Sequence, residues 1–180
     1  MAEIKAADVA KLRKMTGAGM MDCKKALGET NGDFDQAIDI LRKKGQKIAS
    51  KRADREATEG AVIAVTSDDN KKGALIVLNC ETDFVAKNEA FVAFATGIAT
   101  VAMNEMPETL EELRELELNG KKIGDEVTNQ TGIIGEKIDL SYYAKLEGPF
   151  VVSYIHPGNK LATMVTLSKE VADEQVEKDV

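Results

Sequence analysis

The chain has 180 residues, of which 43% are hydrophobic and 31% charged, and its formal net charge at pH 7 is −7. This content supports one or two small folded domains and excludes a chain that is disordered throughout. No apolar run approaches the roughly 18 residues of a membrane span, and the N-terminal segment lacks the apolar stretch of a secretory signal, so we predict a cytoplasmic protein with no membrane contact.

The charge is unevenly distributed along the chain. Residues 1–52 carry a net charge of +5, whereas the remaining residues carry −12. This contrast predicts two separate modules. The basic module contains Phe34 as its only aromatic residue and shows no base-stacking or groove-reading pattern, so we do not expect direct nucleic-acid binding.

Three short amphipathic helices are predicted in the first 45 residues. The first ends at Gly17–Gly19, the second spans about Met21–Thr30, and the third begins at Asp33 and ends before Gly45. Asp33 and Gln36 form a variant of a capping box. The apolar positions expected to face the core are Val9, Leu12 and Met15, then Cys23, Ala26 and Leu27, then Phe34, Ala37, Ile38 and Leu41.

Met20 and Met21 lie in a glycine-flanked segment just before the second helix. If Cys23 and the following apolar residues face the core, at least one of the two methionines is exposed. A flexible thioether side chain on the surface is suited to docking a partner. Alternatively, the two methionines pack against the bundle. The sequence pattern leaves both interpretations open.

A charged segment, Gln46–Gly60, predicts a linker or a solvated extension of the third helix, and hence a domain boundary. Two apolar β-forming runs follow, Ala61–Thr66 and Ala74–Cys80, and we expect them to pair as a hairpin. Thr82 can then N-cap a helix whose first turn contains Asp83, an acidic residue that suits the positive end of the helix dipole.

Phe84 admits two interpretations. It falls at helical spacing on the same face as the apolar residues Phe91, Ala95, Ile98 and Ala102. This pattern indicates a core phenylalanine in the first turn. The pattern does not exclude an exposed, partner-binding side chain.

Further elements are predicted in the remaining chain. We expect a helix over Pro107–Leu118 and leave residues 121–134 undecided. We also expect Phe150–Ile155 to pair with Leu161–Leu167 as a hairpin. Before this hairpin, the alternation of Ile138, Leu140 and Tyr142 with polar residues predicts a strand that is buried on one face. The last dozen residues are expected to begin another helix.

The chain does not have the motifs of an enzyme. It contains one histidine and no zinc, redox or nucleotide-binding motif, so we predict a binding protein without cofactor or metal site. Cys23 and Cys80 are predicted to be reduced thiols. The adjacent acidic pairs Asp68–Asp69 and Glu111–Glu112 point in different directions on a turn or an exposed helix, which indicates solvated charge.

Two long segments, TGAGMMDCKKAL (Thr16–Leu27) and NCETDFVAKNEAF (Asn79–Phe91), resemble the signature regions of bacterial translation elongation factor Ts. Members of this family are the guanine-nucleotide exchange factors of the GTPase elongation factor Tu. IGEKIDL (Ile134–Leu140) and YIHPGNKLA (Tyr154–Ala162) resemble family segments more loosely. Ser141–Tyr142 stands where many members carry two arginines, so the resemblance implies no role for these two positions.

The resemblance implies an α+β fold in which a ubiquitin-associated-like three-helix module precedes a small core of antiparallel hairpins and helices. The domains expected are residues 1–45 for the module, 46–60 for the linker, 61–147 for the core, and 148–180 for the start of a second, incomplete subdomain.

The resemblance also implies a mechanism without a catalytic side chain. Asp83 and Phe84 would insert near the magnesium and phosphate site of elongation factor Tu, and the helical module would dock through its methionines. A histidine that helps the core contact the partner corresponds to His156, although an ordinary exposed turn histidine fits equally well. The implied partner-binding residues are Met20, Met21, Lys24, Thr82, Asp83, Phe84, Val85 and His156. The alternative function is an adaptor without exchange activity.

Many members of this family are longer, so we expect this chain to be a fragment or a short member. An isolated two-stranded hairpin is marginal in water, and Val171 and Val176 offer it little apolar cover. Residues from about 148 onward are therefore expected to be loosely held, or held by a second copy of the chain in a homodimer.

Overall fold

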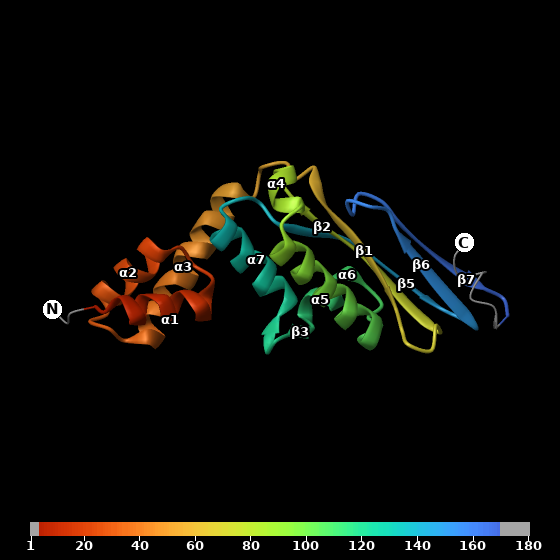
Figure 1. Cartoon of the computed structure of the whole chain (residues 1–180), viewed down its shortest axis with the longest axis horizontal. Helices are drawn as coiled ribbons and strands as arrows, with labels where there is room; N and C mark the ends of the chain where they lie inside the picture. The colour runs from red at the N-terminus through yellow and green to blue at the C-terminus, as the bar shows by residue number, and fades with distance from the viewer. Residues whose placement is uncertain (1–3, 170–180) are drawn as a thin grey trace. The chain divides into compact units, whose positions relative to one another are not determined.

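The computed structural model describes residues 4–169, which fall into two compact units (Figure 1). Unit 1 comprises the chain up to Asp54 together with Thr128–Glu136, and unit 2 comprises Arg55–Val127 and the chain from Lys137 onward. The helix expected over the last dozen residues, with Val171 and Val176, lies outside the described residues.

Unit 1 contains the predicted three-helix bundle. Its helices are α1 (Ala6–Thr16), α2 (Met20–Glu29) and α3 (Phe34–Arg52). Asp33 caps α3 as predicted, because its carboxylate accepts a hydrogen bond from the Gln36 backbone N–H at 3.0 Å. The Gln36 side chain donates to the same carboxylate at 3.0 Å, whereas the Asp33 backbone N–H, which a capping box would join to that side chain, donates to the Thr30 carbonyl. The buried core of the bundle is Val9, Leu12, Cys23, Ala26, Leu27 and Ala37.

Two details of the bundle prediction are wrong. Met15 does not face the core, since 53% of its surface is exposed in the last turn of α1. The third helix does not end before Gly45 but continues to Arg52, so part of the charged segment is a helical extension. Gly45 is buried inside α3, and its backbone lies so close to Gly132 that a side chain on Gly132 would collide with it.

Unit 2 is built on a three-stranded antiparallel sheet in the order β1–β2–β5. Its strands are β1 (Glu59–Thr66), β2 (Lys72–Cys80) and β5 (Asp139–Glu147), and the first two form the predicted hairpin. Alternate residues of β2, namely Ala74, Ile76, Leu78 and Cys80, are fully buried. Helix α5 (Glu89–Glu105) packs against β1 and β2, and Asn88 caps its start.

The second predicted hairpin, β6 (Phe150–Ile155) and β7 (Ala162–Leu167), covers the other side of the sheet from α5 (Figure 1). Gly73 of β2 lies under this hairpin, and a side chain at this position would collide with Met164 and Val151. Residues Phe150–Val152 are buried. The hairpin is therefore packed against the sheet of the same chain and is not an isolated ribbon.

The short elements of unit 2 depart most from the prediction. They are α4 (Asp83–Ala86), α6 (Leu110–Glu115), β3 (Glu117–Leu118) and β4 (Lys121–Lys122), followed by α7 (Ile123–Ile134), which begins in unit 2 and continues into unit 1. The helix expected over Pro107–Leu118 is thus limited to α6. The undecided segment 121–134 is β4 and α7.

Tyr142 is exposed, although its alternation with Leu140 predicts that both lie on the buried face of the strand. Leu140 pairs with Leu78 of β2, but Tyr142 already pairs with Val77, so Ser141 is an extra residue at a β-bulge. One extra residue reverses the faces of all side chains that follow it. The sequence pattern gave no sign of this bulge.

Candidate functional site

The segment that links β2 to α5 is a single helical turn, α4, held at both ends. The Thr82 hydroxyl accepts a hydrogen bond from the Val85 backbone N–H at 3.5 Å, as the N-cap prediction requires. The Cys80 thiol donates to the Thr82 carbonyl at 3.2 Å. At the far end, the Lys87 N–H donates to the Asp83 carbonyl, and the Asn88 side chain then caps a new helix. The helix expected to start at Thr82 is therefore two helices.

Phe84 points away from the protein. Its exposed fraction is 83%, the largest among the exposed large hydrophobic side chains, whereas Ala86 in the same turn is 4% exposed. The break at Lys87–Asn88 causes this difference, because it removes Phe84 from the face of α5 on which Phe91 is buried. The core interpretation of Phe84 is wrong, and Val85 beside it is half-buried.

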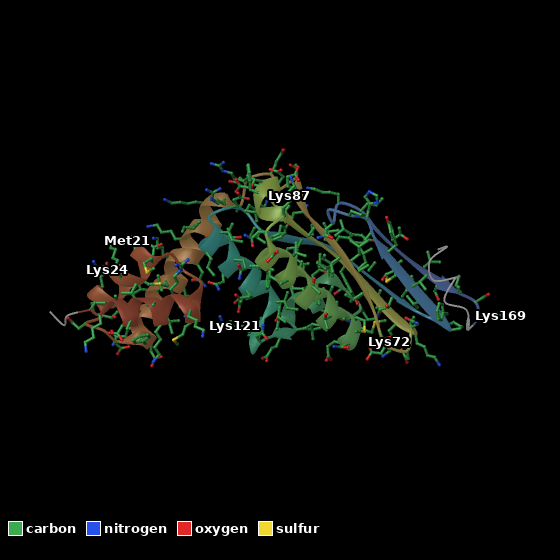
Figure 2. All side chains as sticks on the ribbon, viewed as in Figure 1. Met21, Lys24, Lys72, Lys87, Lys121 and Lys169 are labelled. Carbon is green, nitrogen blue, oxygen red and sulfur yellow. The ribbon has the colours of Figure 1, made fainter. Side chains whose placement is uncertain are left out.

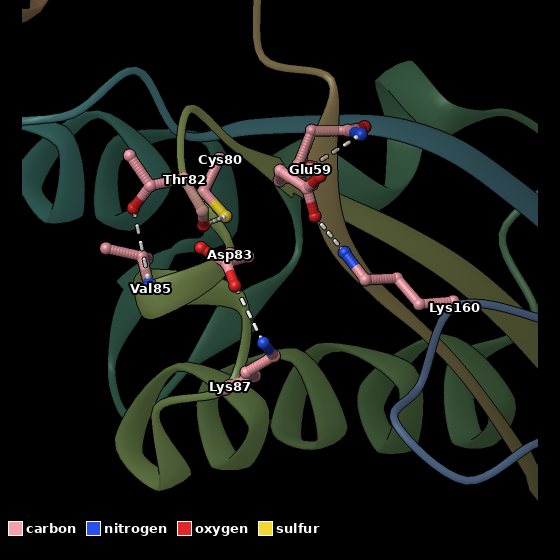
Figure 3. A network of polar contacts seen from close by, with 8 residues as sticks. Glu59, Cys80, Thr82, Asp83, Val85, Lys87 and Lys160 are labelled. Carbon is pink, nitrogen blue, oxygen red and sulfur yellow. Dashed lines mark hydrogen bonds and ion pairs between the residues drawn. The ribbon is translucent and has the colours of Figure 1, made fainter.

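Two ion pairs flank the α4 turn (Figure 3). Asp83 pairs with Lys87 at 2.6 Å, and Glu59 at the start of β1 pairs with Lys160. The hydrogen bond from Lys87, then the charge of Lys87 and, more weakly, that of Lys160 lower the pKa of Asp83. The same bond raises the pKa of Lys87. Asp83 is therefore a carboxylate at neutral pH.

The turn between β6 and β7 brings His156 to the end of the sheet where α4 lies. Lys160 of this turn pairs with Glu59, and the Asn159 carbonyl accepts a hydrogen bond from the Val62 N–H at 2.8 Å. His156 is exposed, and its Nδ1 lies 2.9 Å from the Tyr154 hydroxyl. The structure thus gathers two of the predicted segments, residues 82–85 and His156, at one end of unit 2.

The other predicted residues form a separate surface on unit 1, at the start of α2. Met20 and Met21 are 49% and 73% exposed, and Lys24 one turn later is also exposed (Figure 2). Met21 lies away from the face of α2 that Cys23 and Leu27 bury, whereas Met20 shares the spacing of that face but lies in the first turn of the helix, where about half of its surface is exposed. The alternative in which they are tucked against the bundle is wrong.

Three exposed residues were not identified from the sequence. Met15 is a third exposed methionine of unit 1, while Lys87 and Lys160 add positive charge near Asp83. The Asp83–Lys87 pair has the i, i+4 spacing of a helical ion pair, which is a signal that sequence reasoning can use. The approach of Lys160 depends on the packing of the hairpin and has no local signal.

Residues 4–169 hold no group of three His, Cys, Asp or Glu side chains suited to a metal ion. None of the helices in this part of the chain is long and apolar enough to cross a membrane.

Comparison with known proteins gives a consistent result. Residues 81–180 match the family model described as Elongation factor TS. Proteins named Elongation factor Ts match at 57% identity in Christiangramia forsetii (95% of this chain, 62% of that protein) and at 58% in Flavobacterium psychrophilum (93% and 61%). Another, from Flavobacterium johnsoniae, is 52% identical over 100% of this chain and 56% of its own length. The chain thus spans about three fifths of the length of these relatives.

Proposed function

Because the chain belongs to the elongation factor Ts family, we propose that it acts in translation elongation as a guanine-nucleotide exchange factor for elongation factor Tu. It works in the cytoplasm, where translation occurs, and it acts by binding and not as an enzyme. An exchange factor binds the nucleotide-free GTPase more tightly than the loaded one. Reciprocity then requires that it weaken nucleotide binding by the same factor.

The exposure of Phe84 is the observation that carries this proposal. A large apolar side chain is held out in solvent on a turn that Thr82 caps at one end and the Asp83–Lys87 pair ties at the other. Full burial of such a side chain stabilises a complex by about 1.5–3 kcal/mol, equivalent to about 10- to 100-fold in affinity. A preformed turn also loses little conformational entropy when it binds.

Asp83 and Phe84 are proposed to insert beside the magnesium and phosphate site of the GTPase. Displacement of Mg²⁺ removes charge neutralisation from the β-phosphate, and movement of the phosphate-binding loop removes its N–H donors. Both changes weaken the binding of GDP only while Asp83 and Phe84, which we call the wedge, remain inserted. We propose that His156, at the same end of unit 2, contacts the partner together with this turn.

The surface formed by Met20, Met21 and Lys24 is proposed to dock unit 1 on the same partner. Methionine side chains adapt their shape to an opposing surface at low cost, and a nearby lysine adds attraction to an acidic rim. This surface contributes affinity, whereas the α4 turn contributes the difference in affinity between loaded and empty GTPase. A chain that docks on the partner but does not distinguish the loaded from the empty GTPase would be an adaptor, which is the alternative function.

The test is release of fluorescent GDP from elongation factor Tu after addition of this chain. We expect faster release with the unaltered chain and a loss of most of the acceleration in Phe84→Ala. Tyr142→Ala is a matched control, because it also removes an exposed aromatic ring, on β5. Acceleration that survives in Phe84→Ala would contradict the proposed wedge, and complex formation without any acceleration would identify an adaptor.

A further inference from the structure

The strongly exposed methionines among residues 4–169 all belong to unit 1. Three methionines are strongly exposed, Met15 at 53%, Met20 at 49% and Met21 at 73%, and they lie within seven residues at the junction of α1 and α2. The other three methionines between residues 4 and 169, which are Met103, Met106 and Met164, are only partly exposed. The thioether surface of unit 1 is therefore the part most accessible to a small oxidant.

Both thiols are protected by contrast. Cys23 and Cys80 are 0% exposed, and each lies in hydrogen-bonding range of a backbone carbonyl, that of Ala18 for Cys23 and that of Thr82 for Cys80. Oxidation of a cysteine requires an accessible thiolate. In this chain a peroxide therefore reaches thioethers before thiols.

We propose that Met20 and Met21 form a modification site for peroxides, and that their conversion to sulfoxides switches off the docking surface of unit 1. A thioether sulfur attacks one peroxide oxygen, the O–O bond breaks and an S–O bond forms. The sulfur loses two electrons, and the other oxygen leaves as water after proton transfer. The docking half of this proposal rests on the proposed function, whereas the chemical half does not.

The fold tolerates this modification. The side chains of α2 in the buried core of the bundle are those of Cys23, Ala26 and Leu27, and they are not the ones modified. A sulfoxide adds a strong acceptor to a side chain that must be buried in the complex. Burial of an unpaired polar group is unfavourable, so we expect binding to weaken about tenfold or more.

The chemical test uses the full chain treated with hydrogen peroxide and analysed by peptide mass spectrometry. We expect sulfoxide to accumulate at Met21, Met20 and Met15 before Met103, Met106 and Met164, with both cysteines unmodified. Methionine sulfoxide reductases with dithiothreitol should reverse the change. Earlier oxidation at Met164 or at a cysteine would overturn the proposal.

The docking test compares the unaltered chain with a Met20→Leu/Met21→Leu variant, which keeps apolar side chains and cannot form a sulfoxide. After peroxide treatment, native hydrophobic-interaction chromatography should show a larger loss of retention for the unaltered chain than for the variant, in which Met15 is the remaining strongly exposed methionine among the described residues. Binding to elongation factor Tu should fall in the same sample and persist in the variant. Equal behaviour of both proteins would overturn the switch. If the untreated chain does not bind elongation factor Tu at all, the proposed function fails. The chromatographic retention and the order in which the methionines are oxidised still test the modification site in that case.

Discussion

The Lys87 ammonium lies 2.6 Å from the Asp83 carboxylate, so the residue that follows α4 is tied to the residue that begins it. This bond lowers the pKa of Asp83 from its ordinary value of 3.8 and raises that of Lys87 from 10.5. A depressed acid pKa contributes stability above the unfolded pKa, which is lost as pH falls through the folded one. A raised lysine pKa contributes stability that is lost only as pH rises through the folded value.

The first prediction is that removal of Lys87 moves the Asp83 titration upward. In Lys87→Met, carboxyl ¹³C NMR should give an Asp83 midpoint closer to 3.8 than in the unaltered chain. Lys25→Met, which breaks an exposed pair with Glu29 in unit 1, should leave that midpoint unchanged. Since the pair stays ionised between about pH 5 and 9, it should add no pH dependence to GDP release in that range. Identical midpoints in both variants would contradict the ion pair.

The second prediction separates two phenylalanines that are seven residues apart. Phe84→Ala should change the free energy of unfolding by no more than about 0.5 kcal/mol, because its ring contacts mainly solvent. Phe91→Ala should cost about 3–5 kcal/mol, because that side chain is 4% exposed. Urea unfolding gives both values. A large loss of stability in Phe84→Ala would return this residue to the core.

Much of the fold could be predicted from the sequence, because its main signals are local. The hairpin of β1 and β2 follows from two apolar β-forming runs separated by a polar turn, and the Asp33 cap follows from residue type and position. The burial of Cys23, Ala26 and Leu27 follows from helical spacing. The exposure of Met20 and Met21 was one of two interpretations left open.

The rest depended on interactions between distant segments. Phe84 and Phe91 fit one helical face, and only the cap at Asn88 divides them between two helices. Gly45 resembled a helix end, but its partner Gly132 is distant in the sequence. The bulge at Ser141 reversed the face of the next residue, Tyr142, and no pattern in β5 alone indicates it. The α4 surface itself was identified from its resemblance to a family and not from its periodicity.

The third prediction concerns the cap that creates this division. The Asn88 side-chain oxygen accepts hydrogen bonds from the Ala90 N–H at 2.9 Å and the Phe91 N–H at 3.4 Å. Asn88→Ala should therefore cost about 1 kcal/mol in the free energy of unfolding. Asn88→Asp keeps the acceptor and should cost much less. Equal losses in the two variants, measured by urea unfolding, would show that the cap is not what stabilises the start of α5.

The last prediction concerns the contact between α3 and α7 inside unit 1, where Gly45 and Gly132 face each other. A methyl group on Gly45 would lie 3.6 Å from the Gly132 Cα, an ordinary contact, whereas a methyl group on Gly132 would collide with the Gly45 backbone. Alanine is favoured over glycine inside either helix by about 0.5–1 kcal/mol.

The two substitutions should therefore have opposite effects. Gly45→Ala should hold or raise the melting temperature, because the gain in helix propensity is not offset by a clash. Gly132→Ala should lower it, since the backbones must separate and overpacking costs about 1–3 kcal/mol. Gly28→Ala in α2, where a side chain would meet no atom within 4 Å, measures the propensity gain alone. Equal shifts for Gly45→Ala and Gly132→Ala in thermal melts would refute the asymmetric contact.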